Sequence, residues 1–262
     1  MVAGATLIKG MNIGDPIHTP MQPIFNSETV TPESYQTLID VAKEFGYPVS
    51  YIQEQGGALV HNLLPVHKTE TQQISTSSKV ELELHTELAF HPYRPNYVLL
   101  LCLRGDNKAM TTFSDGNNFI NYLNNDVIYT LSQQLYVTTL DQSFISSESA
   151  DVQINLSILE PADFGDFPWK IRFDWALMRG INDRAQSALA ELRKAISLFV
   201  KKVSLEAGDL LIINNDTTVH GRLPFQPRYD GSDRWVQRLL VRRTLPPVSE
   251  MSGRFVISTK FT

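Results

Sequence analysis

The sequence VELEL at residues 80–84 alternates apolar and acidic side chains, and YVLLLCL at residues 97–103 follows it as an uninterrupted apolar run. Strict alternation is typical of a β-strand with one buried face, whereas a short apolar run is typical of a strand buried on both faces. Further strands are expected at residues 127–138, 152–159, 171–173, 210–213 and 235–243. Many short strands without strand–helix alternation predict a mainly β fold with flanking helices, in which an antiparallel double sheet forms a double-stranded β-helix, or jelly-roll, core.

Two helices are expected to flank this core. Residues 33–45 place apolar side chains at helical spacing directly after Pro32, a residue that suits the first turn of a helix. A longer amphipathic helix is expected from a cap at Asn182 or Asp183 to Val203, a length of about six turns.

The composition is that of an ordinary globular protein. The chain has 262 residues, a formal net charge of −5 and a pI near 5.7, so we expect one domain over residues 1–262 that binds neither nucleic acid nor an anionic membrane. No apolar run approaches the roughly 18 residues of a membrane span. The first residues lack the pattern of a secretory signal, so we expect a cytoplasmic protein. The single cysteine, Cys102, lies within the apolar run and is interpreted as a structural thiol.

A candidate metal site starts at His85 and Glu87. In an extended chain, residues two apart project from one face, so both side chains could reach one ion. This spacing alone is weak, because a histidine beside a glutamate is more often a solvated pair. His220, which follows the strand at residues 210–213, could be the third ligand. Two histidines and one carboxylate on one side of a metal are typical of non-haem iron(II) oxygenases, whereas a structural zinc site would favour cysteine. The other histidines, among them His61, show no ligand spacing.

The stretch RWVQRLLVR at residues 234–242 places Arg234, Arg238 and Arg242 on one face of a strand, together with branched apolar side chains. One interpretation is an edge strand protected by positive charge. The other is a clamp for carboxylates, because the planar guanidinium group binds a carboxylate through two parallel hydrogen bonds.

These motifs resemble those of clavaminate synthase and its relatives, which are iron(II)- and 2-oxoglutarate-dependent oxygenases of the TauD-like superfamily. The resemblance rests on HTELAFHP at residues 85–92, RPNYVLLLCLR at 94–104, HGR at 220–222 and PRYDGSDRWVQR at 227–238, and it extends over about residues 5–245. It implies that His85, Glu87 and His220 bind iron. It further implies that Arg234 binds the distal carboxylate of 2-oxoglutarate.

The same resemblance assigns further site residues. Thr112 matches the threonine whose hydroxyl meets the distal carboxylate, with Thr111 as a close competitor. Arg238 matches a residue that binds the substrate carboxylate or helps to hold the co-substrate. Three more residues match positions beside the substrate: Gln55, Ser75 and Asp174. Each also has an alternative interpretation. Gln55 could belong to a Gly-rich turn, Ser75 could be a surface serine, and Asp174 could be an exposed acid at the end of a strand.

The implied activity is hydroxylation of an unactivated side-chain carbon of a free L-amino acid. The amino acid would be polar or basic, such as arginine, lysine, citrulline or asparagine, and the cofactors would be Fe(II), 2-oxoglutarate and O2, with succinate and CO2 as products. Arginine hydroxylases of this type often carry a second acid two residues after Asp174, where this chain has Ala176. Family members usually have a longer segment before the first helix, so part of the substrate cover is expected to be missing or to come from a partner chain. Two alternatives remain open: a desaturase or cyclase of secondary metabolism, and a jelly-roll protein that binds a small acid without turnover. The oligomeric state is left open.

Overall fold

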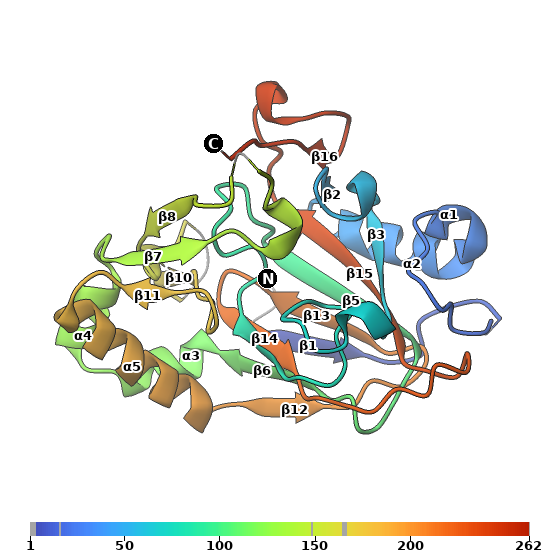
Figure 1. Cartoon of the computed structure of the whole chain (residues 1–262), viewed down its shortest axis with the longest axis horizontal. Coiled ribbons are helices and arrows are strands. Elements are labelled where there is room, and N and C mark those ends of the chain that lie inside the picture. Colours follow the sequence, from blue (N-terminus) through green and yellow to red (C-terminus); the bar gives the residue numbers. More distant parts are fainter. Residues whose placement is uncertain (1–3, 16, 148, 164–166, 262) are drawn as a thin grey trace.

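The larger of two facing sheets contains most of the chain's long strands. The computed structural model describes residues 4–15, 17–147, 149–163 and 167–261, and within these residues seven strands form this sheet, in the order β1-β13-β5-β15-β2-β16, with β3 also paired to β15 (Figure 1). Its strands are β1 (Ala5–Ile8), β2 (Tyr47–Tyr51), β3 (Val60–Leu63), β5 (Tyr97–Arg104), β13 (Leu210–Asn214), β15 (Trp235–Arg242) and β16 (Val256–Ile257). Its pairs are antiparallel except that of β16 with β2.

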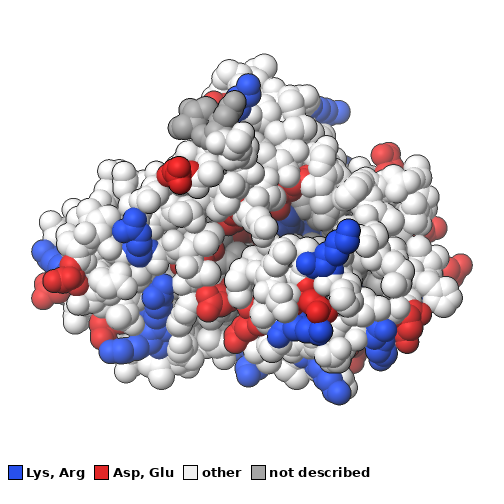
Figure 2. Space-filling view, viewed as in Figure 1, with Lys and Arg blue, Asp and Glu red and all other residues white. Residues whose placement is uncertain are grey.

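A smaller antiparallel sheet has the order β12-β6-β14-β4. Its strands are β4 (Leu82–His85), β6 (Thr111–Asp115), β12 (Lys201–Val203) and β14 (Thr218–Arg222). Arg238 of β15 donates a hydrogen bond to Glu87, which follows β4, so this contact joins the two sheets. In the space-filling view of the same face, acidic and basic groups lie at the bottom of a recess near the centre of the molecule (Figure 2). The predicted jelly-roll core is therefore confirmed.

Alternate residues of β5 and β15 face opposite sides of the larger sheet, as the sequence predicts for strands buried on both faces. Leu99, Trp235 and Leu239 pack on the outer side against Leu38 of α2 (Pro32–Lys43). The inner side carries a different apolar cluster, to which the two strands contribute Val98, Leu100, Cys102, Val236 and Leu240. Because Arg234 and Arg238 alternate with the outward residues of β15, both face the inner side, where the smaller sheet lies.

The outer side of the smaller sheet is covered by helix α5 (Asp183–Leu198). Leu84 of β4 and Val219 of β14 pack there against helix residues such as Leu189 and Ile196. Asn182 caps this helix by accepting a hydrogen bond from the Ala185 N–H group. The residues adjacent to Leu84 and Val219, His85 and His220, consequently face inward.

Several element predictions were wrong in part. Residues 127–138 do not form one strand, because α4 (Asn125–Leu131) precedes β7 (Tyr136–Thr139). The Asn124 side chain accepts a hydrogen bond from the Val127 N–H group, and this cap starts a helix despite the branched side chains that favour a strand. The long helix ends at Leu198 instead of Val203, since residues 201–203 pair with β6 as β12.

The remaining strands form two small sheets beside the core. Their members are β7, β8 (Gln153–Leu156) and β11 (Arg179–Gly180) in one, and β9 (Leu159–Pro161) and β10 (Trp169–Ile171) in the other. The strand expected at residues 171–173 thus ends at Ile171, and Phe173 instead forms hydrogen bonds with Thr86. The remaining α-helices of the described residues are the short α1 (Ser27–Val30) and α3 (Gly116–Phe119). Among the described residues, no helix has the length and apolar character required to cross a bilayer.

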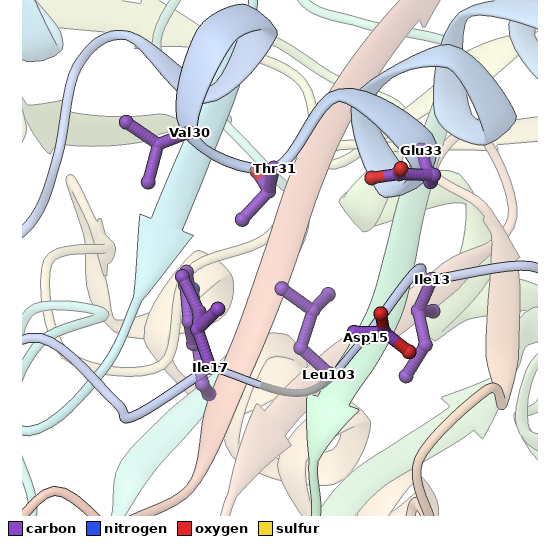
Figure 3. Close-up of a pocket in the computed structure, with 8 residues that line it drawn as sticks. Ile13, Asp15, Ile17, Val30, Thr31, Glu33 and Leu103 are labelled. Carbon is purple, nitrogen blue, oxygen red and sulfur yellow. The ribbon is translucent and has the colours of Figure 1, made fainter.

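A small hollow on the outer side of the larger sheet lies apart from the predicted site. It opens between the N-terminal segment and the α1–α2 region (Figure 3). Its lining consists of Ile13, Asp15, Ile17, Val30, Thr31, Glu33, Leu103 and Trp235. None of these is a predicted site residue, so the functional site is sought on the inner side.

Candidate active site

His85, Glu87 and His220 meet between the two sheets. His85 ends β4 and lies opposite His220 of β14, with the two ring centres 4.6 Å apart. Glu87 lies in the turn after β4, and its Oε2 atom is 3.5 Å from His220 Nε2. One potential ligand atom from each of the three residues lies within 4.8 Å of the other two. The predicted triad is therefore brought together by strand pairing.

The chemistry of these donors fits a divalent metal ion. His85 Nδ1 lies 2.8 Å from the Glu83 carbonyl oxygen, so it carries the proton and donates, which leaves Nε2 free as a ligand. Burial lowers the pKa of His220 and keeps the ring neutral. Burial raises the pKa of Glu87. The charge of Arg238 and a hydrogen bond with His220 outweigh this effect, so the pKa of Glu87 lies well below its usual range. Two neutral imidazoles and one carboxylate are the set that binds non-haem iron(II) and leaves coordination positions open.

Arg238 lies at the centre of a buried charge network. Its Nη1 atom donates to Glu87 Oε1 at 2.6 Å, and its Nη2 atom donates to Glu54 Oε1 at 2.9 Å. Nη2 also lies 2.6 Å from His61 Nδ1. Burial, and then the charge of Arg238, lower the pKa of His61 to about 3, so this ring is neutral and accepts the hydrogen bond. Arg238 therefore occupies one oxygen of Glu87 and leaves the other directed toward His220.

Two buried arginines face the same side of the site. Arg234 precedes β15, and Arg222 ends β14, where Nη2 donates to Ser77 Oγ. Burial, and then the charge of Arg234, lower the pKa of Arg222 to about 9, which places the two cations near each other. No carboxylate forms an ion pair with either arginine within the described parts of the chain. Two unpaired buried cations in proximity are costly unless an anion binds between them, so this region suits the distal carboxylate of a dicarboxylic acid.

The strand register corrects the preference for Thr112 over Thr111. Thr111 pairs with Arg222 and Thr112 pairs with Gly221, so Thr111 shares the inner face of the sheet with His220 and Arg222. Thr112 lies on the outer face, where the neighbouring Ser114 donates to a carbonyl of α5. The hydroxyls of Thr111 and Thr112 are both buried without a hydrogen-bond partner among the described residues, so the strand face alone distinguishes them. Thr111 is therefore the hydroxyl placed to meet an anion beside Arg222.

Two aspartates extend the site toward a substrate side chain. Asp174 forms an isolated bridge with His85, and its Oδ1 atom accepts from the Ala176 and Leu177 N–H groups. Asp141 follows β7 and was not singled out by the sequence. Burial raises the pKa of Asp141 well above its usual range, and the charges of Asp174, Glu87 and Glu54 raise it further. Several acids thus share one region, a place where a cation would be stabilised.

Gln55 and Ser75 are less directly supported by the structure. Gln55 has a positive φ of 44° and a buried side-chain oxygen without a described partner, but the contact with Arg238 is made by its neighbour Glu54. Ser75 is half-buried, and no hydrogen bond to it is described within residues 4–15, 17–147, 149–163 and 167–261. Ser77, two residues later, makes the contact with Arg222. Sequence reasoning missed Glu54, Asp141, Arg222 and the role of His61.

The jelly-roll core, the His85–Glu87–His220 cluster and the two inward-facing arginines, Arg222 and Arg234, together define a non-haem iron(II)- and 2-oxoglutarate-dependent oxygenase. Residues 28–240 match the sequence profile of the "Taurine catabolism dioxygenase TauD, TfdA family". The chain belongs to this family.

Similar proteins act on or bind free amino acids. The chain is 36% identical over 251 residues to the L-lysine 3-hydroxylase of Catenulispora acidiphila, an alignment that covers 92% of this chain and 68% of that enzyme. A crystal structure of asparagine oxygenase with Fe(II), (2S,3S)-3-hydroxyasparagine and succinate superposes with a TM-score of 0.85 at 30% identity, over 98% of this chain and 80% of that one. The oxygenase OrfP with Fe, succinate and (3S)-hydroxy-L-Arg gives a TM-score of 0.86 at 28% identity, over 97% and 82% of the respective chains.

Proposed function

We propose that the protein hydroxylates an unactivated side-chain carbon of a free L-amino acid with a basic side chain, and that it converts 2-oxoglutarate and O2 to succinate and CO2. The observation that carries this proposal is the group of acids near the triad: Glu54 pairs with Arg238, Asp174 bridges to His85, and the charges of both acids act on Asp141. An excess of buried acids favours a cationic ligand over a neutral one.

The backbone groups of an amino acid have matching partners in the charge network. The Nε atom of Arg238 and the Oε2 atom of Glu54 are both buried and have no hydrogen-bond partner among the described residues. A substrate α-carboxylate would accept from Arg238, while the α-ammonium group would donate to Glu54. His61 holds Arg238 in place through its neutral Nδ1 atom.

The side chain of the substrate would extend toward Asp141 and Asp174. An ammonium or guanidinium group there would donate to Asp141 and favour its ionised form, which burial otherwise disfavours. Asp174 uses one oxygen to hold its own turn, so it supplies charge rather than a complete hydrogen-bonding group. The positive side chain of the bound amino acid would then offset part of the negative charge of Glu54, Asp141 and Asp174.

His85, Glu87 and His220 would hold the iron, and Arg234 with Thr111 and Arg222 would hold the far carboxylate of 2-oxoglutarate. When bound, iron and 2-oxoglutarate supply the oxidising power that activates a C–H bond. The protein residues bind the amino acid, orient one of its carbons toward the metal and exclude water. Residues from 54 to 238 contribute to this one site, which supports a single catalytic domain over residues 1–262. We also propose a cytoplasmic location.

The test is succinate release with Fe(II), ascorbate and 2-oxoglutarate, with mass detection of products. The substrates are L-lysine, L-ornithine, L-arginine, L-citrulline and L-asparagine, and L-norleucine serves as a control that has the carbon chain of lysine without its charge. We expect a product heavier by one oxygen atom from a basic amino acid and none from norleucine. A product lighter by two hydrogen atoms would favour the desaturase alternative. Absence of succinate with every substrate would favour the binding protein, and a preference for a neutral amino acid would contradict the role of the acids.

A further inference from the structure

The metal ligand Glu87 lies where sheet hydrogen bonds no longer hold the chain. Strand β4 ends at His85, and Glu87 occupies the turn that follows. The next residue, Leu88, has a positive φ of 52°, a conformation that residues with a branched side chain rarely adopt. The peptide groups on either side of Glu87 therefore need partners from elsewhere in the chain.

Both partners come from one side chain, that of Asn215. Its Oδ1 atom accepts from the Glu87 N–H group at 2.7 Å, and its Nδ2 atom donates to the Glu87 carbonyl oxygen at 3.1 Å. Nδ2 also donates to the Pro95 carbonyl oxygen at 2.8 Å. Asn215 is fully buried, and its amide orientation is fixed because its partners are one donor and two acceptors.

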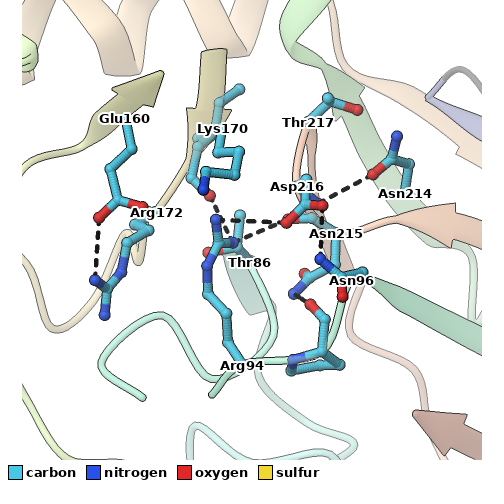
Figure 4. Close-up of polar contacts among 12 residues, drawn as sticks. Thr86, Arg94, Asn96, Glu160, Lys170, Arg172, Asn214, Asn215, Asp216 and Thr217 are labelled. Atoms are coloured by element: carbon cyan, nitrogen blue, oxygen red, sulfur yellow. Dashed lines mark hydrogen bonds and ion pairs between the residues drawn. The ribbon is translucent and has the colours of Figure 1, made fainter. Parts of the chain in front are cut away.

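Asn215 is itself held in the turn that joins β13 to β14, the strand of His220. Its N–H group donates to the Asn96 carbonyl oxygen at 2.9 Å, and its carbonyl oxygen accepts from Arg94 Nη1 at 3.2 Å. The next residue, Asp216, forms ion pairs with Arg94 and Arg243. Figure 4 shows the Arg94 and Asn96 side chains directed toward Asp216 in this turn. A buried ion network thus fixes Asn215 relative to the strand that carries the second ligand.

We propose that Asn215 is a positioning residue for the metal site, whose carboxamide fixes the backbone of Glu87 relative to His220. Without it, the Glu87 turn would be held by fewer hydrogen bonds, and the two ligands would have to be ordered when the metal binds. Outer contacts that orient metal ligands typically change metal affinity by about 10–100-fold when removed. This inference rests on the proposed function of the triad, but its test requires no amino-acid substrate.

The experiment measures anaerobic binding of Fe(II), and of Co(II) as a visible probe, by wild type, Asn215→Ala and Asn62→Ala. Asn62 is a matched control, because it is also fully buried, and its amide bonds to Trp235, Gln237, Ile24 and Ser27 on the outer side of the larger sheet. Thermal unfolding of the metal-free proteins reports the structural cost of each change. We expect similar losses of Tm in both variants and a metal dissociation constant raised about 10–100-fold only in Asn215→Ala.

Equal metal affinity in the two variants would overturn the positioning role. If Asn215→Ala is too unstable to purify, Asn215→Ser allows the same comparison. The serine hydroxyl is too short to reach the N–H group and carbonyl oxygen of Glu87 together with the carbonyl oxygen of Pro95. An Asn215→Ser protein that binds metal as wild type does would also overturn the proposal. Failure of wild type to bind either metal would instead refute the triad, so the two failures are distinguishable.

Discussion

Replacing Arg238 by methionine should destabilise the metal-free protein strongly. Arg238 pairs with Glu87 at 2.6 Å and with Glu54 at 2.9 Å, and the side chains of all three residues are at most 14% exposed. The variant would leave two buried carboxylates without their cation. Breaking a buried pair by removing one partner costs about 3–5 kcal/mol. Since 1 kcal/mol shifts Tm by about 2–4 °C in a protein of this size class, the loss corresponds to roughly 6–20 °C.

The loss of stability in Arg238→Met should also depend on metal and on pH. A divalent ion bound at Glu87 supplies the missing positive charge, so Fe(II) or Co(II) should raise the Tm of Arg238→Met more than that of wild type. Burial raises the pKa of Glu54, and Arg238 opposes this effect. Without Arg238, the pKa of Glu54 in the folded state lies still further above its unfolded value. Proton uptake by Glu54 then favours the folded state. The stability that Arg238→Met loses relative to wild type should therefore become smaller as pH falls and larger as pH rises.

The assay is thermal unfolding of wild type, Arg238→Met, Glu54→Gln and the double variant, each with and without metal. Glu54→Gln in the Arg238→Met background removes one of the orphaned charges and should recover part of the lost stability. A free energy of unfolding of Arg238→Met within about 1 kcal/mol of the wild-type value, a loss typical of an exposed ion pair, would contradict the buried-pair interpretation. Equal stabilisation of both proteins by metal would also contradict it.

Three further predictions concern the ligands. Arg234→Gln and Arg222→Gln should each raise the KM for 2-oxoglutarate about 10–100-fold, because a hydrogen bond to a charged group contributes about 1.5–3 kcal/mol; steady-state kinetics with an unchanged KM in either variant would remove that arginine from the co-substrate site. Thr111→Val should raise the same KM about 2–10-fold, as expected for one hydrogen bond, while Thr112→Val should leave it unchanged, and the reverse order would contradict the face assigned from the strand register. For a basic substrate, kcat/KM should rise with pH as Asp141 loses its proton. Burial and the charges of Asp174, Glu87 and Glu54 raise the pKa of Asp141, whereas the charge of Arg238 lowers it. A pH profile of Asp141→Asn that still shows this rise would exclude Asp141 as its origin.

Periodicity in the sequence was sufficient to predict the core of the fold. The alternation around Arg234 and Arg238 specifies which residues of β15 face inward, and the structure confirms that Trp235 and Leu239 pack on the other side. Residues 127–131 show where this reasoning fails, because the Asn124 cap stabilises a helix that their branched side chains do not favour. Local propensity was outweighed by a cap and by burial of Leu131.

The site was predictable only where its residues share a strand or a motif. His85 and Glu87 lie two residues apart in one motif, whereas Asp141 lies in a loop that carries no recognisable local pattern. Glu54 directly precedes the predicted Gln55. Its position before a Gly-rich turn does not predict that its carboxylate contacts Arg238, which lies far away in the sequence. Thr111 and Thr112 differ only in face, and that difference depends on the register between β6 and β14, which the sequence of one strand does not specify.

The most direct test of the central claim is an anaerobic titration of the protein with Fe(II) and 2-oxoglutarate, followed by a basic L-amino acid. We expect a visible metal-to-ligand charge-transfer band in wild type that changes when the amino acid is added, and no such band in Glu87→Ala. Absence of the band in folded wild type, or an equal band in Glu87→Ala, would contradict the assignment of His85, Glu87 and His220 as the iron site.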